Sequence, residues 1–224
     1  MSYFYSSTVG KKFWMSLSGL FLISFLAVHL TANLMLIFDD SGELFNRVVH
    51  FMGTNPIIKI MEPVLAIGFL FHIFLATILT LRNQTTRTVK YKVEKRGHTS
   101  SWASRNMYVL GTIVIVFLLL HLANFWYKFK FGELPAVNYD GVEMENAYGL
   151  VSGLFSIWWY DVIYIIGALA LGYHISHGFW SSFQTIGWSN EHWRFKIFTP
   201  LAYAYAILIA VGFSIIPLFF LMLK

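Results

Sequence analysis

The amino-acid sequence predicts an all-α integral membrane protein, in which a bundle of five transmembrane helices forms one membrane domain over residues 1–224. The first observation is composition: 57% of the residues are hydrophobic and only 12% are charged, unlike a typical soluble domain. The second is length, because a helix needs roughly 20 apolar residues to cross a bilayer. The stretches that meet this requirement are residues 13–38, 57–81, 106–127, 160–183 and 197–223.

The first stretch runs without a charge from Phe13 to Phe38 and follows Lys11 and Lys12. A signal peptide also has an apolar segment after basic residues, but that segment is shorter and ends at a small-residue cleavage site. This stretch has twenty-six residues and leads into two aspartates. We therefore expect it to stay in the protein as the first helix.

The segments before, between and after the apolar stretches carry most of the charge. The distribution of their basic and acidic residues predicts that the N-terminus is cytoplasmic and the C-terminus lies outside. In this orientation the inner segments, 1–12, 82–105 and 184–196, hold eleven basic and two acidic residues. The outer segments and helix ends hold five basic and nine acidic residues. Basic residues accumulate on the cytoplasmic side of membrane proteins, which gives the orientation.

The chain has a net charge of +5, and its positive charge is concentrated in the inner segment 82–105. Two explanations stay open: membrane topology alone, and docking of a cytoplasmic partner subunit. The segment has no aromatic-basic pattern of a nucleic-acid reader, so we expect membrane lipid around the protein and no nucleic-acid partner. The sequence has no cysteine, which excludes cysteine-ligated iron–sulfur clusters and covalently attached c-type haem.

A histidine lies deep in each of the first four predicted helices: His29, His72, His121 and His174. Ionisable residues inside membrane spans are costly and are usually functional. A single one would more often be structural, whereas four in four helices point to a shared role. His177 follows His174 by three residues and stays open as an alternative ligand, a neighbour of a cofactor or a packing residue.

The depths of these histidines predict two pairs. Counted from the inner ends of the spans, His29 and His121 lie 16 and 15 residues in, and His72 and His174 each lie nine residues in. At about 1.5 Å per residue these are two layers, ~23 Å and ~14 Å from the inner boundary. A bis-histidine haem requires two imidazoles that face each other at one depth, so we expect two b haems, one held by each pair.

Two further patterns bear on this hypothesis. A zinc or di-metal site would gather its ligands at one depth, with carboxylates or cysteines among them, and no acid lies near these histidines in the sequence. Small residues lie near both predicted layers and suit either a flat macrocycle or close helix packing. They are Gly19 and Gly111 near the inner layer, and Ala66, Gly68, Gly167 and Ala168 near the outer layer.

The chain resembles the dihaem cytochrome b subunit of succinate:quinone oxidoreductases, the membrane anchor of succinate dehydrogenase and fumarate reductase, and is most similar to its Bacteroidetes branch. The resemblance covers essentially the whole chain. The segments that carry it are SLSGLFLISFLAVHLTANL, LAIGFLFH, ASRNMYVLGTIVIVFLLLHL and, as the most specific, LGYHISHGFWSSFQTIGW.

The resemblance implies a complex in a bacterial inner membrane, with a flavoprotein subunit and an iron–sulfur subunit as partners. This chain would do no dehydrogenase chemistry itself. It would pass electrons between the iron–sulfur subunit and menaquinone or menaquinol. The family pattern assigns His72 and His174 to the inner haem and His29 and His121 to the outer haem, with His174 rather than His177 as the ligand.

Two departures from the family pattern concern protons and haem propionates. Some relatives carry a glutamate, part of a proposed proton route, where this chain has Gly172, and one has a propionate-binding lysine where this chain has Thr185. Near the inner boundary, the candidates for propionate binding are Arg105, Trp102, Ser16, Ser18 and His177. Near the outer haem, a quinone site needs a polar group beside an apolar slot, and the candidates are Glu62 and Asp161.

Two alternatives remain from the sequence. The chain could be a haem b anchor of another respiratory enzyme, such as a hydrogenase or a formate dehydrogenase, although those anchors have other helix counts and histidine arrangements. It could also be a haem-free channel or scaffold whose histidines hydrogen-bond between helices. The direction of turnover, succinate oxidation or fumarate reduction, stays open in the leading hypothesis.

Overall fold

The computed structural model describes residues 7–85 and 102–222. Within these ranges it contains five helices that are long and apolar enough to cross a membrane, which confirms the prediction of a helical, multi-pass membrane protein. The first two are α1 (Thr8–Phe38) and α3 (Pro56–Thr85). The third span consists of α5 (Met107–His121), a π-helical turn η2 (Leu122–Trp126) and α6 (Tyr127–Phe131). The fourth is α8 (Trp158–Thr185). The fifth consists of α9 (Glu191–Trp193), a π-helical turn η3 (Arg194–Phe198) and α10 (Thr199–Met222).

Several of these helices start earlier than their apolar stretches, because capping residues set the ends. The α1 helix begins at Thr8, where the hydroxyl of Ser7 accepts a hydrogen bond from the backbone N–H of Gly10. The last helical run begins at Glu191, where the side chain of Asn190 accepts from the N–H of Trp193. Apolar length therefore located the helices but not their first residues. The predicted final residue, 223, lies outside the described part.

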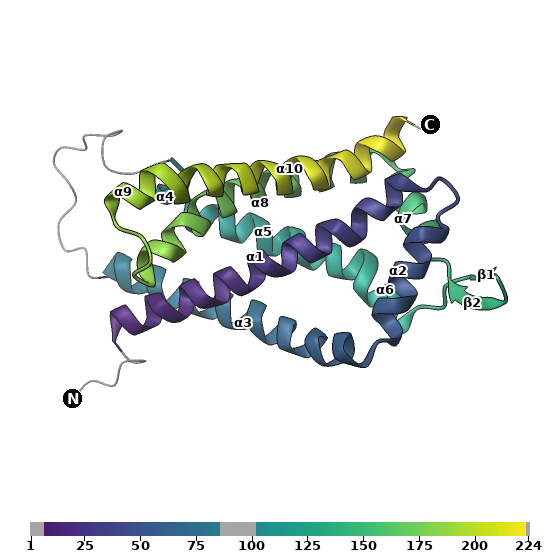
Figure 1. Cartoon of the computed structure of the whole chain (residues 1–224), viewed down its shortest axis with the longest axis horizontal. Coiled ribbons are helices and arrows are strands. Elements are labelled where there is room, and N and C mark those ends of the chain that lie inside the picture. Colours follow the sequence, from purple (N-terminus) through teal and green to yellow (C-terminus); the bar gives the residue numbers. More distant parts are fainter. Residues whose placement is uncertain (1–6, 86–101, 223–224) are drawn as a thin grey trace.

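The helices run back and forth between two ends of an elongated bundle (Figure 1). One end, here called the α9 end, holds the start of α1, α4 (Trp102–Arg105) and α9. The opposite α2 end holds α2 (Glu43–Thr54), α7 (Ala147–Phe155) and a small β-hairpin. The start of α1 and the end of α10 lie at opposite ends, as an odd number of crossings requires.

The β-hairpin departs from the purely helical prediction. Strands β1 (Ala136–Tyr139) and β2 (Val142–Glu145) pair antiparallel, with Tyr139 opposite Val142. The two turn residues between them, Asp140 and Gly141, have φ angles of 53° and 82°. Asp-Gly is favoured in two-residue hairpin turns because both positions need positive φ. The sequence therefore carried a signal for this element.

The hairpin and α2 form a hydrogen-bonded cap at the α2 end. Asn46 of α2 is 1% exposed; its amide donates to the Tyr139 hydroxyl at 3.1 Å and accepts from the Tyr148 backbone N–H at 2.8 Å. Arg47 bridges Glu43 and Asp140, each at 2.6 Å. Because a buried amide with both of its groups satisfied strongly favours one arrangement, the cap is an ordered part of the fold.

Helix packing is uneven across the bundle. The α8 and α10 helices pack closely, and a Cβ atom on Gly172 would lie 2.8 Å from the Cβ of Ala210. The Tyr205 hydroxyl ties α10 to α1 by donating to the carbonyl of Ile23 at 2.6 Å. In contrast, only 6% of the apolar window of α3 is buried within the protein, compared with 39% for α8. The α3 helix is thus held by few contacts, and each of them matters for its position.

Candidate functional site

The structure brings the four predicted histidines together as two pairs, each with one ring from two different helices. The ring centres of His29 in α1 and His121 in α5 are 5.7 Å apart, with an interplanar angle of 88°. The ring centres of His72 in α3 and His174 in α8 are 6.3 Å apart, at 72°. These are the two pairs that equal depth in the sequence predicted.

The ring separations suit two imidazoles on opposite sides of one metal ion. A first-row metal ion lies about 2 Å from an imidazole nitrogen, and the ring centre lies about 1 Å further, so two axial imidazoles have ring centres about 6 Å apart. Both observed distances are close to this value. The geometry is therefore compatible with axial ligation by both pairs.

The two pairs lie at different levels of the bundle, and two glycines mark the separation. A Cβ atom on Gly19 would lie 3.5 Å from Cε1 of His72, and one on Gly111 would lie 3.5 Å from Cε1 of His174. Gly19 precedes His29 by ten residues, and Gly111 precedes His121 by ten. Ten helical residues span about 15 Å, and the ring levels differ by somewhat less because side chains tilt toward the helix N-terminus.

This matching geometry divides the site into two similar halves. In each half a glycine on one helix faces a histidine of its antiparallel partner, α1 with α3 and α5 with α8. Each half supplies one histidine to each pair. The glycines predicted from small-residue spacing thus lie directly beside the His72–His174 pair, where a flat group next to the rings would need a helix surface without side chains.

The His72–His174 pair has different partners on its two rings. The Ser18 hydroxyl donates to the Met15 carbonyl at 2.9 Å and lies 3.2 Å from Nδ1 of His72, so Nδ1–H can donate to it. This arrangement leaves Nε2 of His72 as the unprotonated nitrogen, the form that binds a metal. On the other ring, Nδ1 of His174 is buried without a hydrogen-bond partner among the described residues.

Aromatic side chains surround the His29–His121 pair. The ring centre of His29 lies 5.2 Å from that of Phe25, which stacks on it, and 5.6 Å from that of Phe213. The ring centre of His121 lies 5.3 Å from that of Phe125. The π-helical turn η2 begins at the residue after His121, and such turns inside helices occur frequently at functional sites. The rings exclude water from this pair.

Tyr164 and Asn124 are polar neighbours on the His121 side of this pair, and sequence reasoning missed both. The ring of Tyr164 lies 6.1 Å from that of His121. Its hydroxyl accepts a hydrogen bond from the Asn124 amide at 3.1 Å, and both residues are buried. Their positions in the sequence, three residues after His121 and ten before His174, gave no signal of this contact.

The residues predicted to bind haem propionates are scattered. Ser18 contacts His72 as described above, and the Ser16 hydroxyl donates to the carbonyl of Lys12 in its own helix at 3.0 Å. Trp102 is 57% exposed and packs edge-on against Tyr173 of α8, while Arg105 is exposed at the end of α4. The ring of His177 packs edge-on against Trp180.

The two carboxylates predicted for a quinone site lie in different environments. Glu62 of α3 accepts a hydrogen bond from the indole of Trp126 at 2.6 Å and pairs with Lys130 at 2.7 Å. Its side chain is 33% exposed. Asp161, in the first turn of α8, is fully buried at 0% exposure. Trp126 and Lys130 are further candidates that the sequence reasoning did not name.

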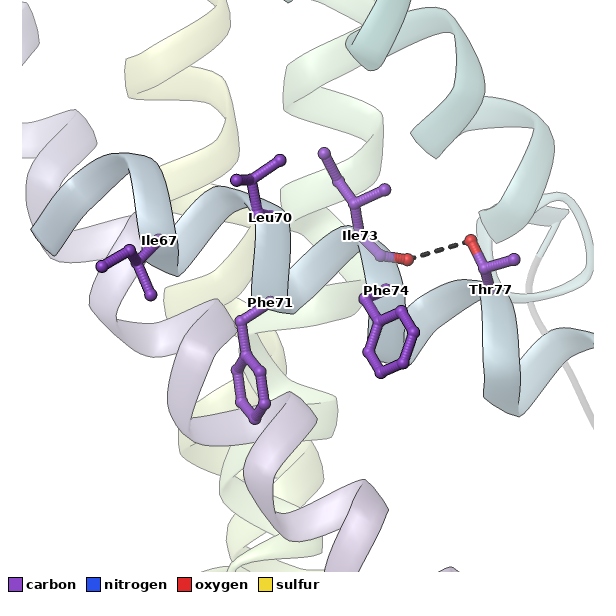
Figure 2. Close-up of a pocket in the computed structure, with 6 residues that line it drawn as sticks. All are labelled: Ile67, Leu70, Phe71, Ile73, Phe74 and Thr77. Carbon is purple, nitrogen blue, oxygen red and sulfur yellow. Dashed lines mark hydrogen bonds between the residues drawn. The ribbon is translucent and has the colours of Figure 1, made fainter. Parts of the chain in front are cut away.

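An apolar depression of about 650 Å³ lies along α3, and neither of these carboxylates is part of its lining. Figure 2 shows that its lining comes from α3 alone. The hydroxyl of Thr77 is already donated to the Ile73 carbonyl at 2.9 Å, so the lining offers no free donor. It lacks the polar group that a quinone site needs, and its lining is Ile67, Leu70, Phe71, Ile73, Phe74 and Thr77.

Within residues 7–85 and 102–222, no group of three or more His, Asp or Glu side chains is placed to hold a metal ion. The described side chains therefore do not form a zinc site with three or four protein ligands. What they form is two sets of two imidazoles. Comparisons with protein-family models, with curated proteins and with solved structures found no match to this chain.

Proposed function

We propose that this chain is the dihaem cytochrome b subunit that anchors a succinate:quinone oxidoreductase in the membrane. The observation that carries the proposal is the presence of two imidazole pairs, His29–His121 and His72–His174, with ring centres 5.7 and 6.3 Å apart. Imidazole pairs at two levels of a bundle suit two haems stacked along it. The sequence resemblance supports the choice of enzyme.

The residues of each pair fit a b haem. Gly19 and Gly111 give the His72–His174 pair flat flanks, and Nδ1 of His174 is held by no hydrogen bond within the described residues. A bound haem supplies a site that takes up and releases one electron. The chain itself fixes where the two irons lie, orients His72 through Ser18, and keeps water from the His29–His121 pair with phenylalanine rings.

The two ends of the bundle have different roles in this proposal. The α9 end is cytoplasmic and docks the iron–sulfur subunit, which in turn carries the flavoprotein. This assignment is supported by the excess of basic residues in segments 1–12, 82–105 and 184–196. Electrons would then pass between that end and the α2 end by way of the groups that the His72–His174 pair and the His29–His121 pair would hold.

Menaquinone reacts near the α2 end in this proposal, with Glu62 or Asp161 as the proton-handling group. Glu62 is supported by its partial exposure and by Trp126 and Lys130, which fix its carboxylate and supply an N–H donor and a cation beside it. Reduction of a quinone consumes protons, so the site needs a proton donor, and a carboxylate that exchanges protons with water on one side and contacts the ring on the other can fill this role.

Haem counting on single-histidine variants tests the haem proposal. We expect two haems per chain in the wild type and one in each of His29→Ala, His72→Ala, His121→Ala and His174→Ala. His192→Ala is the control, because His192 is exposed at the α9 end and should keep both haems. His177→Ala should also keep both. A purified chain without a bis-histidine b-type optical spectrum would favour a haem-free scaffold.

Co-purification from the native membrane tests the choice of enzyme separately. We expect a flavoprotein with succinate dehydrogenase or fumarate reductase activity to accompany the chain. Recovery of a hydrogenase or formate dehydrogenase with a two-haem chain would keep the cytochrome and replace the partner.

A further inference from the structure

An arginine at the α9 end is held between aromatic rings. The guanidinium carbon of Arg194 lies 4.1 Å from the ring centre of Trp180 in α8 and 5.0 Å from that of Phe195. His177 packs edge-on against the same indole, with ring centres 4.8 Å apart at 87°. Trp180 therefore contacts two potential cations, and its ring restricts the position of the guanidinium.

The polar atoms of this cluster are not satisfied within the described part of the chain. Nε of Arg194 and Nδ1 of His177 are both buried without a hydrogen-bond partner. The terminal nitrogens of Arg194 form no ion pair and no hydrogen bond with any described residue. A buried donor without an acceptor is costly, so the cluster is complete only with an added acceptor.

The side chains of the cluster turn progressively away from the direction of His174 along α8. His177 and Trp180 follow His174 by three and six residues, which turns them by about 60° and about 120° around the α8 axis. Other aromatic side chains at this end are exposed, among them Trp188 at 71% and Phe195 at 58%. Exposed tryptophans near the end of an apolar helix are typical of the level where lipid headgroups lie. At this level the acceptor available from outside the protein is a lipid headgroup phosphate.

We propose that Arg194, with His177, binds the phosphate of an anionic phospholipid in the leaflet that borders the connection from α8 to α10. A phosphate oxygen pair matches the two parallel N–H groups on one edge of a guanidinium, and a third oxygen can accept from Nδ1–H of His177. The acyl chains lie along the apolar surface of α8 and α10. This proposal does not rest on the proposed haem binding or on the identity of the partner subunits.

Lys196 provides a matched control for the charge. It lies two residues after Arg194 in the same π-helical turn, is exposed, and is not stacked on Trp180. Non-specific attraction of anionic lipid to the basic end of the bundle would depend on both cations. Binding at a specific site would instead depend on Arg194 and not on Lys196.

Native mass spectrometry of the full-length purified protein measures the binding, with phosphatidylglycerol as the probe and phosphatidylcholine of the same chain length as the reference. We expect Arg194→Gln to weaken phosphatidylglycerol binding about tenfold, the size of one charge-assisted hydrogen-bonded contact. Lys196→Gln should change it less than about twofold. His177→Phe, which keeps a ring against Trp180, should weaken it a few-fold, roughly one neutral hydrogen bond.

Two results would overturn the proposal. The first is equal phosphatidylglycerol binding by the wild type and Arg194→Gln, and a shifted haem midpoint potential in the same variant would then identify the acceptor as a haem propionate. The second is an equal loss in Lys196→Gln, which would show general charge attraction. If Arg194→Gln does not fold, as judged by circular dichroism, His177→Phe alone decides between a site and none.

Discussion

At the scale of single residues, Ser16 and Ser18 form a natural comparison. Both hydroxyls donate to carbonyls of α1, but Ser18 also lies 3.2 Å from Nδ1 of His72. Partners of the second ring nitrogen fix the tautomer and orientation of a metal-binding histidine. Sequence reasoning placed both serines near the haem propionates, whereas the structure gives Ser18 a contact with the histidine ring itself.

We therefore predict that Ser18→Ala weakens binding of the haem at His72 and His174, whereas Ser16→Ala leaves it unchanged. Loss of such a partner typically costs about 10-fold or more in metal affinity. Haem retention during dialysis, followed by the b-type spectrum, measures the difference. Equal retention in the two variants would show that Ser18 only packs against the ring.

The four histidines could be identified from the sequence because a polar ring inside an apolar helix is conspicuous and its depth can be counted. Arg194 could not be identified in this way. It lies in a polar segment with several charged neighbours, and its role depends on a contact with Trp180, fourteen residues earlier across a reversal of the chain. Trp126 and Lys130 were missed for the same reason, since their contact with Glu62 joins two helices that are distant in sequence.

At the scale of elements, the interface between α8 and α10 depends on Gly172. A Cβ atom there would lie 2.8 Å from the Cβ of Ala210 and 3.2 Å from the carbonyl oxygen of Ala206. Both neighbours are parts of α10 that cannot rotate away. The same geometry leaves no room for a carboxylate side chain at this position, unless the two helices move apart.

We predict that Gly172→Ala destabilises the protein by about 1–3 kcal/mol through overpacking. The control is Gly153→Ala in α7, where nothing lies within 4 Å of the added Cβ. That change should be neutral or should stabilise the helix by roughly 0.5–1 kcal/mol. Thermal unfolding in detergent, followed by circular dichroism, compares the two. A similar midpoint for both variants would mean that α8 and α10 pack less tightly than described.

The start of α2 depends on the ionised form of Asp39. Hydrogen bonds from the backbone N–H of Leu44, and then from the hydroxyl and N–H of Ser41, hold the pKa of Asp39 below its usual value of 3.8. Because the pKa is lower in the folded state, ionised Asp39 stabilises α2 fully above pH 3.8. The contribution is lost as the pH falls through the lowered value.

Hydrogen exchange of the α2 amides, corrected for the intrinsic rate at each pH, measures this effect. We expect constant protection between about pH 7 and pH 5 and a loss below about pH 4. Asp39→Ala should show the weaker protection already at pH 7, with no further step on acidification. A wild-type profile that is flat down to about pH 2 would contradict the role of Asp39.

The elements themselves were predictable in proportion to their apolar length. A stretch such as 57–81 has few alternatives to a helix in a membrane, because its backbone groups must be satisfied internally. The short elements at the α2 end carry weaker signals. The twelve residues of α2 are amphipathic and depend on Asn46 and its contacts with Tyr139 and Tyr148, which no local pattern reveals. Only the Asp140–Gly141 turn had a recognisable local signature.

At the scale of the whole molecule, the two halves of the site have similar construction and α10 is an addition to them. Helices α1 and α3 form one half, and α5 and α8 the other, each with a glycine facing a histidine. The α10 helix supplies none of the four histidines. It packs along α8 and holds α1 through Tyr205 and through Leu30, which lies against Gly212. The α10 helix thus joins the two halves. Each histidine pair also joins them, because its two rings come from different halves.

The orientation of the whole bundle in the membrane can be tested because the natural chain has no cysteine. Glu143→Cys places a thiol on the exposed hairpin at the α2 end, and Gln184→Cys places one near the exposed end of α8, at the α9 end.

The basic residues of the inner segments predict that the α9 end is cytoplasmic. A membrane-impermeant maleimide added to intact spheroplasts should therefore label Glu143→Cys at once and Gln184→Cys only after permeabilisation. Labelling of Gln184→Cys in SDS controls for coverage by a partner subunit. The opposite pattern would place the α2 end in the cytoplasm and would reverse the proposed direction of electron flow through the two histidine pairs.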